Sequence, residues 1–189
     1  MKRCMLLFVS MLLPVFLLLS CHLHDDKSAD LLEAYQIASA EAVKWDKSAQ
    51  PYFISSVDDR LESKSVKGEN GKRNAWNFDF VVENTNKHYI ITLHDKTVVN
   101  KIEAESVTDS ACIIHMEDLC ISAVEAVTIA KENYGLLPGT DWAQGYHFVL
   151  ENNGSALILS VVGRGADGTL LRVLFHAKTG RVVGTAGPL

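Results

Sequence analysis

The chain has 189 residues, of which 48% are hydrophobic and 22% are charged, and its formal net charge is −5. The 12 glycines and 4 prolines exclude a collagen-like or low-complexity chain. Acidic residues outnumber basic residues by 23 to 18, which excludes a basic nucleic-acid-binding protein. The mean hydropathy of +0.08 comes mostly from the first twenty residues, and the remainder is too polar to span a bilayer. The composition therefore predicts one or two small folded domains behind an apolar leader.

The first residues predict export. Lys2 and Arg3 precede an apolar run over residues 5–19, whose length fits a signal peptide better than a transmembrane helix. Ser20 and Cys21 follow the run, and Leu18 stands three positions before the cysteine. This ending resembles the lipobox of bacterial lipoproteins, which has an aliphatic residue three positions before the cysteine and a small residue directly before it. The alternative interpretation is an ordinary secretory signal followed by a chance cysteine.

The lipoprotein resemblance implies that residues 1–20 are removed and that the thiol of Cys21 receives a diacylglycerol. Each methylene buried in a membrane contributes about 0.8 kcal/mol, so two or three acyl chains hold the protein at a membrane surface. Residues 21–29 then form a tether. The mature chain keeps 16 basic and 23 acidic residues, a net charge of −7, so its attachment depends on the acyl chains and not on attraction to anionic lipids. His22 follows the cysteine instead of aspartate, which favours the outer membrane, facing the periplasm, in a Gram-negative host. In a Gram-positive host we expect the outer face of the plasma membrane.

The cysteine count agrees with export. Cys4 is lost with the leader and Cys21 is acylated, which leaves Cys112 and Cys120 in a compartment where thiols oxidise. We predict a disulfide between them, worth about 2–3 kcal/mol on the chain-entropy model. Two buried free thiols are the alternative. A metal site needs more ligands than this pair and the nearby His115 provide.

The rest of the chain contains an internal repeat of two similar units. Two segments place apolar residues on one helix face with spacings of four, three and four: Leu31, Tyr35, Ala38, Ala42 and Ala123, Val127, Ala130, Tyr134. Asp30 and Ser122 precede these segments as capping residues, each with a glutamate three positions later. Gly135 ends the second helix, and the first ends near Trp45.

Segments of alternating polarity follow each predicted helix, and this alternation predicts strands. They cover residues 52–57, 76–83 and 87–94 in the first half, and 146–151, 156–162 and 170–176 in the second. The clearest internal match aligns residues 94–99 with residues 176–183. The sequence therefore predicts an α+β fold made of two similar units, residues 30–107 and 118–189, each with one helix packed on a small antiparallel sheet.

The order of helix, strand and hairpin resembles that of PepSY and PepSY-like domains, which are small exported α+β modules. The resemblance rests on residues 89–99 and 170–183. It implies a binding role, often inhibition or regulation of a peptidase, and it supplies no catalytic residue.

Glycines at 163, 165 and 168 have the spacing of a dinucleotide-binding loop. The segment that follows alternates like a strand, so we interpret residues 163–169 as a hairpin loop and expect no cofactor. The cluster of His22, His24, Asp25 and Asp26 is interpreted as a solvated linker, and we predict no metal.

Three residues are candidates for contact with a partner: His94, His176 and Trp142. The two histidines occupy matching repeat positions next to turns, where a paired pH-sensitive contact is an alternative to exposed strand ends. An exposed tryptophan is a good anchor for a bound protein.

The sequence thus predicts a membrane-anchored envelope protein that is not an enzyme and that binds, inhibits or regulates a peptidase or another envelope protein of unknown identity. One alternative is an immunity-type lipoprotein that neutralises a toxin, because an acidic surface suits a basic partner. The other alternative is a hydrolase, which needs a deep pocket with convergent titratable groups.

Overall fold

The structure is a computed structural model that describes residues 27–58, 67–140 and 143–187. Its elements are two α-helices, two short 3₁₀ helices and eight strands: α1 (Leu31–Trp45), β1 (Gln50–Val57), β2 (Ala75–Val81), β3 (Lys87–His94), β4 (Thr97–Glu105), η1 (Ser110–Cys112), η2 (Met116–Asp118), α2 (Ala123–Tyr134), β5 (His147–Asn152), β6 (Leu157–Arg164), β7 (Leu170–His176) and β8 (Val182–Ala186). None of the helices in these ranges is long and apolar enough to cross a membrane.

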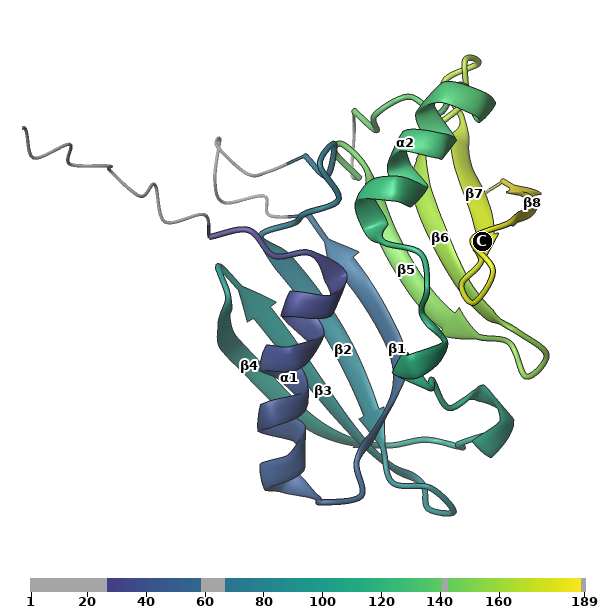
Figure 1. The fold of residues 1–189 in the computed structure, drawn as a ribbon. Coiled ribbons are helices and arrows are strands. Elements are labelled where there is room, and N and C mark those ends of the chain that lie inside the picture. The colour runs from purple at the N-terminus through teal and green to yellow at the C-terminus, as the bar shows by residue number, and fades with distance from the viewer. Residues whose placement is uncertain (1–26, 59–66, 141–142, 188–189) are drawn as a thin grey trace, which may run out of the picture.

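All eight strands form one antiparallel sheet in the order β4-β3-β2-β1-β5-β6-β7-β8 (Figure 1). The halves join where β1 pairs with β5, with Phe53 opposite Glu151 and Ser55 opposite Val149. Both helices lie on the same face, α1 against β2 and β3, and α2 against β6 and β7. A single apolar core runs beneath them. The α+β class is confirmed, but the sheet is not divided: pairing of β1 with β5 buries strand edges that two separate sheets would leave open. The predicted arrangement of two units is therefore not confirmed.

The helices begin where the capping pattern predicts. The side chain of Asp30 accepts a hydrogen bond from the Glu33 amide at 2.8 Å, and the hydroxyl of Ser122 accepts one from Glu125 at 3.2 Å. Gly135 ends α2 with a φ of 62°, a conformation that costs glycine little. Each helix presents alanines to the sheet, and these small side chains let the backbone approach the large aromatic residues of the core.

The glycine-rich segment after β6 is a hairpin loop, as predicted. β6 pairs with β7 directly in antiparallel register, and Gly168 adopts a φ of 82° in the turn. No helix follows the loop, so the arrangement that a dinucleotide pyrophosphate requires is not built here.

The last residues of the predicted tether belong to the fold. Ala29 exchanges two backbone hydrogen bonds with Arg73, at 3.0 and 2.9 Å, and its carbonyl accepts a hydrogen bond from the indole of Trp76 at 3.2 Å. Ser28 and Ala29 are both buried. The chain is therefore fixed to the body of the protein from Ser28 onward. Cys21 lies outside the described residues.

The disulfide predicted between Cys112 and Cys120 is not formed, and both thiols are free. Cys112 ends η1, which packs against β5, whereas the Cys120 amide donates a hydrogen bond to the carbonyl of Ala177, just beyond β7. β6 lies between β5 and β7, so the two cysteines are attached to different parts of the sheet. The eight-residue spacing suggested a closed loop, but it says nothing of these separate attachments.

Candidate functional site

The face of the sheet opposite the two α-helices is the side on which neither helix packs. Side chains alternate along a strand, so residues between core positions point to this side. We call it the open face, and it comprises Phe53 and Ser55 of β1, Asn77 and Asp79 of β2, Ile90 and Thr92 of β3, Asn100 and Ile102 of β4, Val149 and Glu151 of β5, Ile158, Ser160 and Val162 of β6, and Arg172 and Leu174 of β7. No helix in the described ranges covers it.

The open face is rich in apolar and uncharged polar groups. Phe53 is 37% exposed and Ile102 is 48% exposed, whereas Ile90, Val149 and Leu174 are half-buried. Ile158 and Val162 of β6 are buried. The side-chain oxygens of Ser160 and Asn77 are buried and have no hydrogen-bond partner among the described residues. Few charges and exposed aromatic or aliphatic side chains are characteristic of the centre of protein interfaces.

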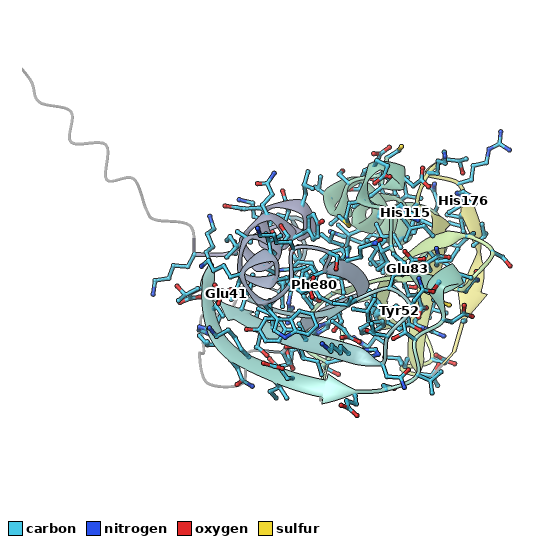
Figure 2. The ribbon with its side chains drawn as sticks, turned by 90° about the horizontal axis from the view of Figure 1, so that it is seen from below. Glu41, Tyr52, Phe80, Glu83, His115 and His176 are labelled. Carbon is cyan, nitrogen blue, oxygen red and sulfur yellow. The ribbon has the colours of Figure 1, made fainter. Side chains whose placement is uncertain are left out.

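A polar group borders the open face at the lower end of β2 and β3. His88 Nδ1 lies 2.9 Å from the Asp79 carboxylate, and its Nε2 lies 3.2 Å from the Thr108 hydroxyl. The ring of Tyr52 meets the imidazole edge-on, with a centroid distance of 5.6 Å. Burial raises the pKa of Asp79, and the hydrogen bond from His88 opposes this shift. These groups satisfy one another, which makes them a structural border. Figure 2 shows the molecule from this end, with Tyr52 labelled.

The predicted partner-binding residues do not form one site. His94 ends β3 and His176 ends β7, and both are half-buried. The antiparallel order of the sheet makes β3 and β7 run in opposite directions, so the two histidines lie at opposite ends of the molecule. A paired contact between them is therefore wrong. Trp142 lies outside the described residues.

A buried polar cluster joins the two halves where β1 ends and β5 begins. His147 Nδ1 lies 3.2 Å from the Ser56 hydroxyl, and its Nε2 lies 3.7 Å from the Asp58 carboxylate. Arg73 is 1% exposed, and one guanidinium nitrogen lies 3.1 Å from Asp58 and 3.3 Å from His147 Nε2. Serine, histidine and aspartate in this order resemble a hydrolytic triad, so their hydrogen-bond directions need to be followed.

The directions of these bonds oppose nucleophilic catalysis. A guanidinium only donates, so His147 Nε2 accepts from Arg73 and the neutral ring carries its proton on Nδ1. That proton points at Ser56, so the imidazole is not placed to remove a proton from the hydroxyl. The Ser56 oxygen also accepts the amide N–H of Phe148 at 2.9 Å, and Ser56 is only 6% exposed. The cluster therefore connects β1 to β5 by hydrogen bonds, and we call it the fastening.

Electrostatics keep this fastening in one charge state. Burial and, to a smaller extent, the nearby Arg73 cation lower the pKa of His147 to about 4, against the opposing effect of its contacts to Ser56 and Asp58. The imidazole is thus neutral at ordinary pH. Among the described residues, no group of three or more histidine, cysteine, aspartate or glutamate side chains is arranged to hold a metal ion.

Comparison with known proteins shows the fold alone. No protein-family model matches the chain, and no curated protein matches it. The chain is similar to a crystal structure of a candidate lipoprotein from Clostridium difficile 630, with 13% sequence identity and a TM-score of 0.59. The match covers 82% of this chain and 92% of that chain, so it includes strands of both halves. The PepSY-like resemblance stays a prediction.

Sequence reasoning missed both the open face and the fastening. The residues of the open face are the outward positions of the predicted strands, so their existence was readable, but their joining into one surface depends on the pairing of β1 with β5. The fastening unites Ser56 and His147, which are 91 residues apart, with Arg73 from a loop. No local spacing signals a cluster of that kind.

Proposed function

We propose that this protein is a lipid-anchored envelope protein that is not an enzyme and that binds another protein through the open face of its sheet. The observation that carries the proposal is that face itself: eight strands with both helices on one side and a partly apolar surface with few charged residues on the other. A monomer gains nothing by exposing such a surface, whereas an interface needs one.

The anchor is supported by two independent observations. Ser20 and Cys21 end an apolar leader as a lipobox does. The protein of similar fold is described as a candidate lipoprotein, which fits the same mode of attachment. Outer-membrane attachment facing the periplasm, or attachment outside the plasma membrane of a Gram-positive cell, follows from the leader.

Charge defines the kind of partner. The mature chain has a net charge of −7, which favours association with a protein of net positive charge by long-range attraction. At the centre of the open face Phe53 stands between Asp79 and Glu151, so the contact surface combines apolar and hydrogen-bonding groups with two carboxylates. The partner that fits is an envelope protein, such as a peptidase under regulation, that presents an apolar patch within a basic surface. A basic toxin has the same chemistry, and the identity of the partner separates these two roles.

In-cell crosslinking tests the proposal. A photoreactive phenylalanine analogue replaces Phe53 or Ile102 in the full lipidated chain, and a control chain carries it at Thr128, which is exposed on α2 on the other side of the sheet. We expect the two open-face positions to crosslink to one and the same protein, and Thr128 not to crosslink to it.

The affinity of purified variants for the purified partner is the second test of the open face. Phe53→Glu places a charge in the open face, while Val43→Glu places one on α1 at a residue that is 50% exposed. We expect Phe53→Glu to weaken binding of the purified partner at least tenfold, and Val43→Glu to leave the affinity unchanged, because burying an unpaired charge in an interface costs several kcal/mol. Equal affinities for the two variants, or crosslinks from Thr128 instead, would show that the open face is not the binding surface.

A further inference from the structure

The helical side of the molecule carries an apolar groove where the amino-terminal ends of α1 and α2 approach one another. The groove has a volume of about 430 Å³. We call six of the apolar residues that line it the groove patch: Leu31, Leu32, Met116, Leu119, Ile121 and Val124. Leu32 is 52% exposed and Val124 is 49% exposed, so the two rims of the groove are apolar and face solvent, while Leu31 and Ile121 form a buried floor.

The groove patch lies next to the point where the tether enters the fold. Asp30 caps α1 and lines the groove, and the preceding Ser28 and Ala29 are fixed to the body of the protein. Cys21 is seven residues before Ser28, where the chain is fixed, so a fully extended link between them spans about 25 Å at most. A lipid carried on Cys21 therefore keeps the membrane surface within reach of the groove rims.

We infer that the groove patch rests on the lipid surface to which Cys21 is anchored. The short link to Cys21 supplies a high local concentration of that surface, in the millimolar range, so even a weak apolar contact is populated. Leu32 and Val124 enter the boundary between headgroups and acyl chains, as exposed apolar side chains of interfacial proteins do. The net charge of −7 points to neutral lipid as the contacting surface, because anionic headgroups repel the chain.

This contact gives the molecule a defined orientation. The helices and the open face lie on opposite sides of the sheet, so a helical layer on the membrane turns the open face toward the aqueous side. The inference rests on the proposed anchor at Cys21, but not on the identity of the protein partner.

A lipid-quenching experiment tests the contact. Cys120 lines the groove and is exposed, which provides a natural labelling site once Cys112 is replaced by serine. The lipidated protein, labelled at Cys120 with an environment-sensitive fluorophore, is reconstituted in phosphatidylcholine vesicles that contain a spin-labelled lipid quencher. The control carries Cys120→Ser and the same fluorophore at Ile102→Cys, on the open face. We expect quenching at Cys120 to exceed that at the control position about threefold or more, and Leu32→Glu together with Val124→Glu to abolish the difference.

Each other outcome overturns the inference and identifies the step that fails. If the mass of the protein shows no lipid on Cys21, the anchor is wrong and the orientation is wrong with it. If Cys21 is lipidated and the protein is bound to vesicles, but both positions are quenched equally, the anchor stands and the groove contact is wrong. A spectral change at Cys120 that follows protein concentration instead of quencher content would identify a second copy of the chain in the groove.

Discussion

Acidification should destabilise the protein through His147. Its folded-state pKa is about 4, against about 6.5 in an unfolded chain. Above the unfolded value both states hold a neutral imidazole, and the residue adds no pH dependence. Between about pH 6.5 and 4 the unfolded chain takes up a proton that the folded chain refuses, so stability falls as pH falls. The difference of about 2.5 pKa units corresponds to about 3 kcal/mol, a large part of the stability of an ordinary domain.

The measurement is urea unfolding at pH values from 8 to 4, for the wild-type chain and for His147→Gln. Glutamine keeps one acceptor for Arg73 and one donor for Ser56 but does not titrate. We expect the variant to be less stable at pH 8 and the gap to close by about 3 kcal/mol as the pH falls to 4, because only the wild-type chain carries this term. His115→Gln changes an exposed histidine outside the cluster and serves as the matched control. Parallel stability curves for the wild-type and His147→Gln chains would refute the account of a buried neutral imidazole.

Three further predictions follow from particular contacts. Ser56→Ala leaves the buried amide of Phe148 in β5 without an acceptor and should lower the free energy of unfolding by about 1–3 kcal/mol. The wild-type chain should not react at Ser56 with a fluorophosphonate probe, as detected by mass spectrometry. A labelled serine would support the hydrolase interpretation instead. Replacing both Cys112 and Cys120 by serine should change stability by much less than the 2–5 kcal/mol that loss of a disulfide costs, and thiol titration of the Cys21→Ser chain without reductant should find both groups reactive. In Gly163→Ala the new methyl group lies 2.4 Å from the Leu137 carbonyl oxygen, so thermal unfolding should show a clear loss of stability. An unchanged transition temperature would mean that the backbone at Leu137 moves away from residue 163 at little cost.

Both helices and six of the eight strands could be predicted because each has a local cause, whereas β4 and β8 were not predicted as strands. Strand β3 and strand β7 were predicted with the bounds that the structure shows, since their alternating polarity is interrupted by turn residues on both sides. The starts of α1 and α2 follow from the capping side chains of Asp30 and Ser122. In each case the information lies within a few residues of the element.

The pairing of the two halves could not be predicted from the sequence, because the strands that pair are far apart along the chain. Either half alone satisfies the pattern of a helix on a small sheet, and nothing in β1 or β5 marks those strands as partners of one another. The fastening by Arg73 and His147 appears only after they pair. Cysteine spacing misled for the same reason: Cys112 and Cys120 are close in sequence but are attached to different strands.

The single sheet makes the face opposite the helices wider than either half alone could make it. Two separate modules would each offer a narrow surface, whereas pairing β1 with β5 joins the strands of both halves in one face. That extension depends on the polar fastening at the junction, since the cluster of Arg73, Ser56, Asp58 and His147 connects the strands on either side of it. If the open face is the binding surface, weakening the fastening should weaken partner binding even where the changed residue lies on the other side of the sheet, as Ser56 does opposite the core residue Trp76. Ser56→Ala therefore separates a surface made by the whole sheet, which would lose affinity, from a contact confined to one half, which would not.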